Sequence, residues 1–194
     1  KATGTPANLV TGDFNNDGSS DIAIASNAVK ANFIKVFFGN GDGTLQPAKR
    51  FIGGKQSNYI TSYDVNLDGN LDILVVSPLA DSVTLFLGDG RGDFERQPDL
   101  AGEKGPQYVV PGEFTDDKIP DLVISNKRDN SISILEGRGD GTFLFPHYNF
   151  PVGPGPRALT KADFNNDGLM DLALVLYQRE MIEVFIRSRE IPDA

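Results

Sequence analysis

The sequence of 194 residues contains no cysteine, no tryptophan and a single histidine, His147. Without cysteine the chain can form no disulfide and perform no thiol chemistry, although this absence does not identify its compartment. Zinc and copper prefer histidine and cysteine ligands, so a site for either metal is not expected. Because His147 lies near no serine or aspartate pattern of a catalytic triad, we predict no catalytic role for it.

Long apolar runs and basic stretches are also missing. No segment approaches the roughly 20 apolar residues of a membrane span, so we predict no insertion into a membrane. The net charge is −9, and no stripe of lysine and arginine is present to contact phosphates, which argues against nucleic acid as a partner. The negative charge is concentrated, because four nine-residue segments hold 13 of the 27 acidic residues and only one base, Lys118.

These four segments recur at intervals of 51, 49 and 50 residues, counted from their first residues. They read DFNNDGSSD (13–21), DVNLDGNLD (64–72), EFTDDKIPD (113–121) and DFNNDGLMD (163–171). A fixed period of about this length indicates repeated structural units. We therefore predict a single repeat domain over residues 1–194, with repeats at approximately 1–52, 53–102, 103–152 and 153–194.

Each acidic segment leads into a short apolar run, at 21–26, 72–77, 121–126 and 171–176. Runs of this length, rich in valine, isoleucine and leucine and bounded by loop residues, indicate β-strands. Their nearly continuous apolar character predicts that both faces are covered. Other short apolar runs precede and follow, and no stretch is typical of a long helix. The predicted fold is all-β: a β-propeller-type array of four blades, each of three to four antiparallel strands, with the acidic loop in the first hairpin.

Oxygen-bearing groups occupy alternate positions of the acidic loops. Positions 1, 3, 5 and 9 carry side-chain oxygens in most copies, the backbone carbonyl of position 7 adds another, and glycine at position 6 allows a sharp reversal. This spacing is similar to the calcium loop of an EF-hand, except that the EF-hand glutamate at position 12 is missing, so position 9 has to complete the shell. Calcium takes roughly 6–8 oxygen ligands, whereas magnesium requires a smaller and stricter octahedron. We predict Ca²⁺ sites formed by Asp13, Asn15, Asp17, Ser19 and Asp21; by Asp64, Asn66, Asp68, Asn70 and Asp72; by Glu113, Thr115, Asp117, Ile119 and Asp121; and by Asp163, Asn165, Asp167, Leu169 and Asp171.

The third loop departs from this pattern. Glu113 is one methylene longer than aspartate, Thr115 is a weaker neutral ligand, and Lys118 replaces the glycine of position 6. We therefore predict three strong calcium sites and a fourth, at 113–121, that is the weakest or is empty, with the Lys118 ammonium partly standing in for the ion. The aromatic residues at position 2, namely Phe14, Phe114 and Phe164, are predicted to pack in the core under the hairpins.

The sequence resembles the FG-GAP/VCBS repeat family, whose best-known relatives are the β-propellers of integrin α-subunits. The resemblance is carried by DFNNDGSSDIAIAS, DVNLDGNLDILVVS and DFNNDGLMDLALVL, together with the glycine-rich turns GNGDGTL and GRGDGTF. It implies that the loops bind Ca²⁺ through positions 1, 3, 5, 7 and 9, and that the protein acts in an extracellular or cell-surface setting. The integrin propeller has seven blades, so the four repeats correspond either to part of a larger propeller or to a small or open assembly.

The first functional hypothesis is a non-enzymatic calcium-binding β-propeller module for extracellular protein binding or adhesion. A lectin-like propeller is the second; the lack of tryptophan weakens it, but Tyr59 and Tyr108, each five residues before a loop, could stack on sugars. The third is an accessory module of a secreted enzyme. Exposed outer strands predict self-association or a larger assembly through the blade edges. Two RGD triplets, at 91–93 and 138–140, occur at different offsets in the glycine-rich turns and are attributed to turn composition rather than to integrin recognition.

Overall fold

The computed structural model describes residues 5–28, 32–101, 103–145 and 148–188, and His147 lies outside these residues. The described chain is all-β, with sixteen strands and one three-residue 3₁₀ helix, so the predicted fold class is confirmed. No helical segment within the described ranges has the length and apolarity needed to cross a membrane.

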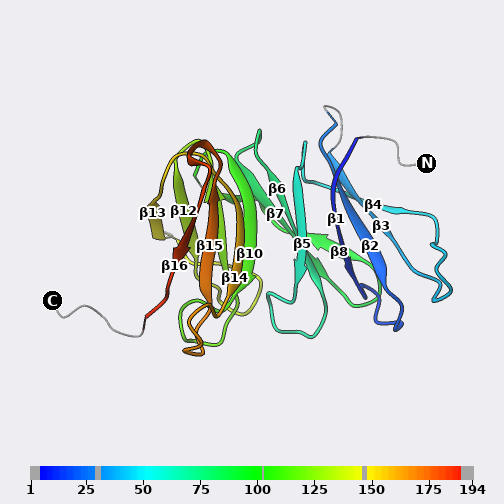
Figure 1. Ribbon diagram of the computed structural model, residues 1–194. Coiled ribbons are helices and arrows are strands. Elements are labelled where there is room, and N and C mark those ends of the chain that lie inside the picture. Colours follow the sequence, from blue (N-terminus) through cyan, green and yellow to red (C-terminus); the bar gives the residue numbers. More distant parts are fainter. Residues whose placement is uncertain (1–4, 29–31, 102, 146–147, 189–194) are drawn as a thin grey trace.

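The strands form four antiparallel sheets, here called blades 1 to 4, that follow one another in sequence order (Figure 1). Blade 1 contains β1 (Pro6–Gly12), β2 (Asp21–Ser26), β3 (Phe33–Phe37) and β4 (Lys49–Ile52). Blade 2 contains β5 (Tyr59–Tyr63), β6 (Asp72–Ser77), β7 (Ser82–Gly88) and β8 (Phe94–Arg96), with β9 (Leu100–Ala101) also pairing with β7. Blade 3 contains β10 (Pro106–Gly112), β11 (Asp121–Asn126), β12 (Ser131–Leu135) and β13 (Tyr148–Pro151). Blade 4 contains β14 (Pro156–Ala162), β15 (Asp171–Leu176), η1 (Tyr177–Arg179) and β16 (Met181–Phe185).

The first hairpin has the same register in every blade. The residue before position 1 of the acidic loop pairs with position 9: Gly12 with Asp21, Tyr63 with Asp72, Gly112 with Asp121, and Ala162 with Asp171. Positions 1 to 8 therefore form the connection, and position 9 is the first residue of the second strand. Because the hairpins are equivalent, the four acidic loops lie along one edge of the row of blades, the lower edge in Figure 1.

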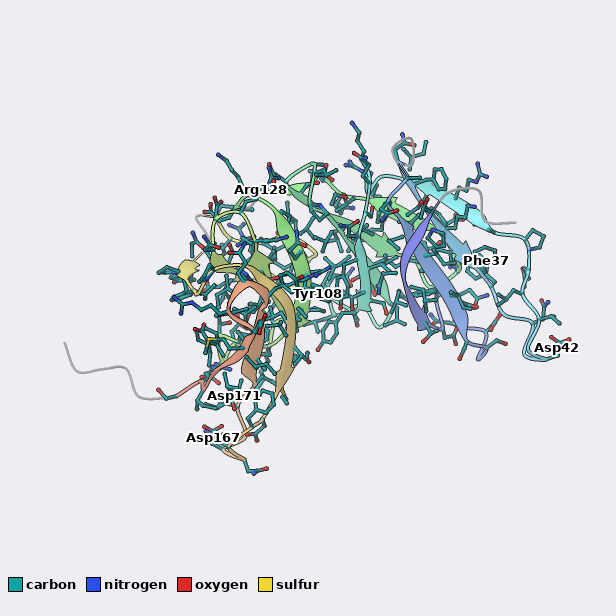
Figure 2. The ribbon with its side chains drawn as sticks, turned by 45° about the horizontal axis from the view of Figure 1, so that its top comes forward. Phe37, Asp42, Tyr108, Arg128, Asp167 and Asp171 are labelled. Atoms are coloured by element: carbon teal, nitrogen blue, oxygen red, sulfur yellow. The ribbon has the colours of Figure 1, made fainter. Side chains whose placement is uncertain are left out.

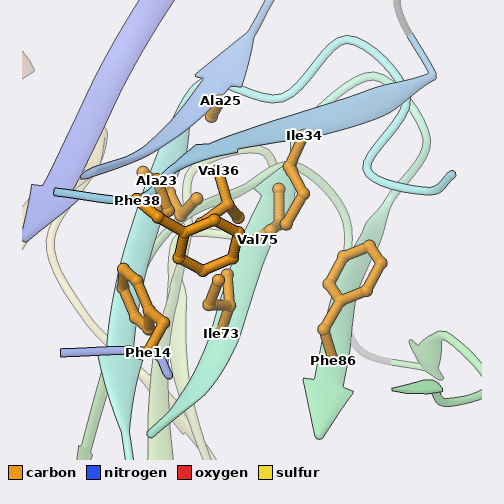
Figure 3. Packing of buried hydrophobic residues seen from close by; sticks show 10 residues of the cluster. Phe14, Ala23, Ala25, Ile34, Val36, Phe38, Ile73, Val75 and Phe86 are labelled. Carbon is orange, nitrogen blue, oxygen red and sulfur yellow. The ribbon is translucent and has the colours of Figure 1, made fainter. Parts of the chain in front are cut away.

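Three hydrophobic clusters hold successive blades together. The cluster between blades 1 and 2 contains Phe14, Ile34 and Val36 from blade 1 and Ile73 and Phe86 from blade 2, all nearly or fully buried (Figure 3). Equivalent clusters lie between blades 2 and 3 and between blades 3 and 4. Burial of apolar surface between neighbouring sheets is thus the main source of stability, as in other stacked repeats.

The position-2 side chain of each loop packs toward the following blade. Phe14 belongs to the cluster between blades 1 and 2, Val65 to the next cluster and Phe114 to the third. Phe164, in blade 4, is 44% exposed, so the prediction that it packs in the core is wrong. The physical reason is that no further blade follows blade 4 among the described residues.

The end blades are also less covered than the middle ones. Strands β6 and β11 are buried along their whole length, as the continuous apolar runs predicted. In β2 and β15 alternate residues are only half-buried, because each end blade has a neighbour on one side. The outer strand β16 is largely exposed, with Ile182 65% and Val184 50% exposed.

Candidate metal centre

The aspartate at position 9 is the buried anchor of each acidic loop. Asp21, Asp72, Asp121 and Asp171 are each at most 1% exposed. One carboxylate oxygen accepts a hydrogen bond from the N–H of position 2, and the other from a backbone N–H at the end of the third strand. The eight donors lie 2.8–3.0 Å away and belong to Phe14 and Gly39, Val65 and Gly88, Phe114 and Gly137, and Phe164 and Arg187.

Burying a carboxylate has an electrostatic cost that a cation would offset. The pKa of Asp72 is raised to about 6, chiefly by desolvation and also by the negative charges of Asp68 and Asp64, while the hydrogen bonds from Gly88 and Val65 lower it. Burial also raises the pKa of Asp121. In this loop the carboxylates of positions 1 and 5 therefore disfavour the charged form of the carboxylate at position 9.

Positions 1, 3 and 5 form a second, more exposed group in loops 1, 2 and 4. In loop 1 the Asp13 carboxylate accepts hydrogen bonds from the N–H groups of Asp17, at 3.1 Å, and Gly18, at 2.8 Å. The Asn15 amide donates to the Asp17 carboxylate at 2.8 Å. Loops 2 and 4 repeat these bonds to within 0.2 Å, through Asp64, Asn66, Asp68 and Gly69 and through Asp163, Asn165, Asp167 and Gly168. Figure 2 shows Asp167 at the tip of the fourth loop and Asp171 where β15 begins.

Glycine at position 6 is required by the backbone of these three loops. Gly18, Gly69 and Gly168 have φ values of 85°, 85° and 86°, in the left-handed region that favours glycine. The turn aims the N–H of position 6 at the carboxylate of position 1, as the hydrogen bonds above record. The sequence prediction that glycine reverses the loop therefore has a structural explanation.

The third loop is folded differently. The Glu113 carboxylate accepts hydrogen bonds from the N–H groups of Thr115, at 2.7 Å, and Asp116, two residues earlier than the donors in loop 1. Thr115 turns its hydroxyl toward the Asp121 carboxylate, at 3.1 Å. Apart from the two bonds to the anchoring aspartate, the bond from position 7 to position 5, Ile119 to Asp117 at 2.7 Å, is the one that matches the other loops.

The side-chain oxygen atoms of loops 1, 2 and 4 suit a cation that prefers oxygen ligands. Each loop offers a half-buried carboxylate at position 1, an exposed one at position 5, an amide at position 3 and a buried carboxylate at position 9. It offers no nitrogen or sulfur ligand of the kind that zinc prefers. Within the described residues no three acidic or histidine side chains meet closely enough to chelate an ion by themselves. A cation would therefore depend on amide and backbone oxygens as well, and the roles predicted for positions 7 and 9 as ligands stay predictions.

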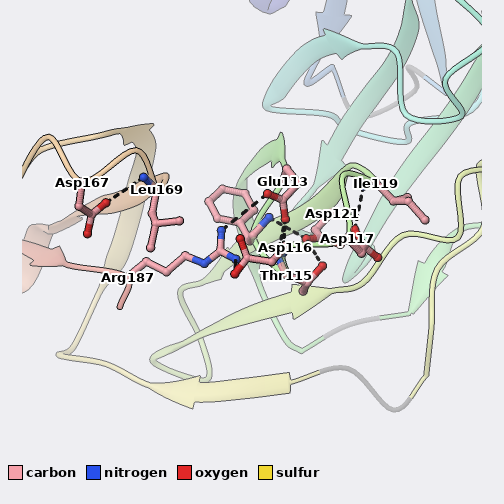
Figure 4. Close-up of polar contacts among 10 residues, drawn as sticks. Glu113, Thr115, Asp116, Asp117, Ile119, Asp121, Asp167, Leu169 and Arg187 are labelled. Atoms are coloured by element: carbon pink, nitrogen blue, oxygen red, sulfur yellow. Dashed lines mark hydrogen bonds and ion pairs between the residues drawn. The ribbon is translucent and has the colours of Figure 1, made fainter. Parts of the chain in front are cut away.

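Arg187 is a site residue that sequence reasoning missed. Its guanidinium lies 2.9 Å from a carboxylate oxygen of Asp116 and 3.8 Å from one of Glu113 (Figure 4). Lys118, which was predicted to stand in for the ion, is exposed and makes no ion pair with the carboxylates of its loop. Aligning the four repeats at the end of their third strands could have found this residue, because Arg187 stands where the other repeats have Gly39, Gly88 and Gly137.

Two other features of the sequence have structural explanations. Tyr59 and Tyr108 stack on each other, with ring centroids 4.3 Å apart, so each covers a face of the other. In the first RGD triplet, Asp93 pairs with Lys49 of blade 1 at 2.7 Å, and a side chain on Gly92 would collide with the ring of Phe38. Both features thus contribute to contacts between neighbouring blades.

Comparison with known proteins identifies the repeat. A model of the FG-GAP-like repeat matches residues 13–75, 64–124 and 113–174, each stretch beginning at position 1 of an acidic loop. No curated protein matches the sequence closely enough to count as a relative.

Solved structures share the fold at low sequence identity. BBS1N in complex with ARL6DN, from a lead-soaked crystal, has a TM-score of 0.63 and 14% identity, over 95% of this chain and 57% of that one. The mercury-soaked crystal of the same complex gives 0.61 and 12%, over 94% and 54%. An Agrocybe aegerita lectin, described as recognising non-reducing terminal N-acetylglucosamine, gives 0.59 and 19%, over 88% and 47%. The chain therefore spans about half the length of the solved chains that it matches.

Proposed function

The chain belongs to the FG-GAP-like repeat family, and from this premise we propose that it is a non-catalytic binding module whose blades are stabilised by Ca²⁺. The observation that carries the proposal is the near-identity of loops 1, 2 and 4. Three hairpins separated by about 50 and 100 residues hold the same donor types in the same hydrogen bonds. Turn formation alone needs neither two carboxylates nor a buried third one in every copy.

In each of these loops the residues that would hold the ion are the carboxylates of positions 1 and 5, the amide of position 3 and the anchoring aspartate of position 9. The bound cation would supply positive charge that offsets the repulsion among these groups. Because the anchor also joins the first hairpin to the third strand, cation binding would stabilise the folded blade over the unfolded chain. Asp64, Asn66, Asp68 and Asp72 form the set in blade 2.

Removal of calcium tests this proposal. We expect excess EDTA to lower the Tm, and added CaCl₂ to restore it, because a ligand that binds only the folded state contributes about 2.7 kcal/mol at 100 times its Kd. MgCl₂ at the same concentration serves as the control and should restore little, since magnesium demands a stricter octahedron. A melting curve that is the same in EDTA and in calcium would refute the proposal.

The proposed setting is extracellular or at the cell surface, with a protein or glycan as ligand. A loop that relies on neutral amide and backbone oxygens suits the weak affinities of extracellular calcium modules, about 10⁻⁴–10⁻³ M. Surface labelling of cells that make the full-length protein would check this setting, and protection of the protein from the label would contradict it.

A carbohydrate ligand is the second candidate, favoured by the fold shared with the Agrocybe aegerita lectin. Tyr59 and Tyr108, the residues predicted to stack on sugars, give this candidate less support, because their rings pack against each other. A glycan array would decide between a glycan and a protein ligand. The accessory-enzyme hypothesis has no specific support in the site geometry.

We also propose that the outer edge of blade 4 takes part in assembly. Among the described strands β16 pairs only with β15, and Ile182 and Val184 are at least half exposed. Backbone and apolar groups are therefore both available to a further strand. Sedimentation of the chain would show association, and a monodisperse monomer at high concentration would contradict it.

A further inference from the structure

Two departures from the repeat lie in contact with each other. The third loop differs from the others at positions 1, 3, 4 and 6, where it has Glu113, Thr115, Asp116 and Lys118. Blade 4 differs from the other blades at the end of its third strand, where Arg187 takes the place of a glycine. The Arg187 side chain reaches back from blade 4 to the third loop, in blade 3 (Figure 4).

In blades 1 to 3 the residue at the end of the third strand has to be glycine, because a side chain there would collide with the acidic loop. A Cβ atom on Gly39, Gly88 or Gly137 would lie 2.1–2.4 Å from the backbone carbonyl oxygen of loop position 8. Each of these glycines donates its N–H to the anchoring aspartate of its own blade. Arg187 keeps this hydrogen bond, to Asp171 at 2.8 Å, and adds a cationic side chain at the rim.

In loops 1 and 3 the side chain at position 4 contacts the next blade along the row. In loop 1 this residue is Asn16, whose amide donates to Asn70 of loop 2 at 2.8 Å. In loop 3 it is Asp116, the only acidic residue at position 4 among the four loops, and it faces Arg187 at 2.9 Å. The charged pair therefore occupies the place of a neutral contact between loops.

The guanidinium is held at this place. Its side chain is only 17% exposed, against 55% for Asp116 and 35% for Glu113. One oxygen of Glu113 accepts the N–H groups of Thr115 and Asp116, which leaves the other facing Arg187 at 3.8 Å. Two of the carboxylates of the third loop are thus directed toward an arginine of the neighbouring blade.

We infer that the third loop does not bind calcium and that the Arg187 guanidinium supplies the positive charge there. The loop lacks the amide of position 3 and the glycine of position 6, and its position-1 carboxylate accepts hydrogen bonds from other donors than in loops 1, 2 and 4. Blades 3 and 4 are consequently joined by an ion pair that does not depend on calcium. This inference rests on the proposed function for its contrast with loops 1, 2 and 4.

The calcium stoichiometry tests the inference and the proposed function separately. Isothermal titration of the chain, after EDTA treatment and buffer exchange, should show three equivalents of calcium. Four equivalents would overturn the inference. No uptake at all would overturn the proposed function, and the ion pair would then be decided by the variants below.

Arg187→Gln should lower the Tm by about 2–4 °C, the shift that a loss of about 1 kcal/mol produces in a chain of this size. The shift should be the same in calcium and in EDTA, because the pair involves no ion. Arg138→Gln is the matched control: it removes the same charge from an exposed residue that directly follows Gly137, the counterpart of Arg187 in blade 3, and should leave the Tm nearly unchanged. A shift no larger than that of the control, or one seen only with calcium present, would overturn the inference.

A double variant shows whether the two residues act together. Asp116→Asn combined with Arg187→Gln should lower the Tm by less than the sum of the single shifts, because each single change already breaks the pair. Additive shifts would contradict the inference. If Arg187→Gln does not fold, Asp116→Asn alone still reports the pair through a shift that is equal in calcium and in EDTA.

A gain of calcium is the complementary test. Replacing the third loop by the residues of loop 1, with Glu113→Asp, Thr115→Asn, Asp116→Asn and Lys118→Gly, together with Arg187→Gln, should raise calcium uptake from three equivalents to four. Uptake that stays at three equivalents would show that these five residues do not exclude the ion, and would overturn the inference.

Discussion

The hairpin loops of blades 1 and 3 begin and end at equivalent residue pairs, Gly12 with Asp21 and Gly112 with Asp121. In both, the buried aspartate accepts two backbone N–H groups at 2.8–3.0 Å. The tips differ: Asp13 accepts hydrogen bonds from positions 5 and 6, whereas Glu113 accepts them from positions 3 and 4 and faces Arg187. The buried half of the loop is therefore constant, and the exposed half is free to change how its charge is balanced.

Removing the anchor should have the largest effect, and the same effect in both kinds of loop. Asp72→Ala and Asp121→Ala each leave two buried N–H groups without an acceptor, which costs roughly 2–5 kcal/mol in the free energy of unfolding. Urea denaturation in EDTA measures this loss, so that the calcium proposed for blade 2 adds nothing to the effect of Asp72→Ala. Asp→Asn at the same positions keeps one oxygen and should lose less, and Glu95→Ala, on an exposed strand, should stay within about 0.5 kcal/mol. A much smaller loss for Asp121→Ala would mean that the loops differ in their buried half too.

Substitution of the position-5 aspartate should change the calcium-dependent rise in Tm for the first loop and leave it unchanged for the third. Asp17 and Asp117 each accept the N–H of position 7 at 2.7 Å, so substitution removes the same hydrogen bond from both. Asp17→Ala should remove roughly one third of the calcium-dependent rise in Tm, if three equal sites contribute. Asp117→Ala should leave that rise unchanged. Equal losses from both variants, measured by differential scanning calorimetry, would remove the proposed difference.

Substitutions at position 6 should change the free energy of unfolding by a smaller amount, lowering it in the first loop and raising it in the third. Gly18 has φ +85° with open space where a Cβ would lie, so Gly18→Ala costs only backbone strain, about 1–2 kcal/mol. Lys118 has φ 67°, and Lys118→Gly relieves that strain, for a gain of up to about 1 kcal/mol. The free energy of unfolding in EDTA measures both, and destabilisation by Lys118→Gly would show that its side chain contributes a contact.

Much of this molecule could be predicted from its repeats. The period located the acidic loops, and the short apolar runs predicted the second strand of every blade, including the fully buried β6 and β11. The third loop was recognised as unusual from Glu113, Thr115 and Lys118 alone. These features are local, because turn residues and strand patterns act over a few positions.

What could not be predicted depends on which blade stands beside which side chain. Phe164 has the same local sequence as Phe14, yet it is 44% exposed because no blade covers it within the described chain. Lys118 was chosen as the cation near the third loop because it lies in that loop. The cation found there is Arg187, whose position is set by the packing of blade 4 on blade 3.

The repeated β-structure and its oxygen-rich loops can be read from the amino-acid sequence, because the strands and turns are encoded within each repeat. Only the packing of the blades shows that the last aspartate of each loop, at position 9, is a buried anchor, and that an arginine some 70 residues away along the chain balances the third loop. Charge balance at that loop depends on distance in space, and the packing of neighbouring sheets sets that distance.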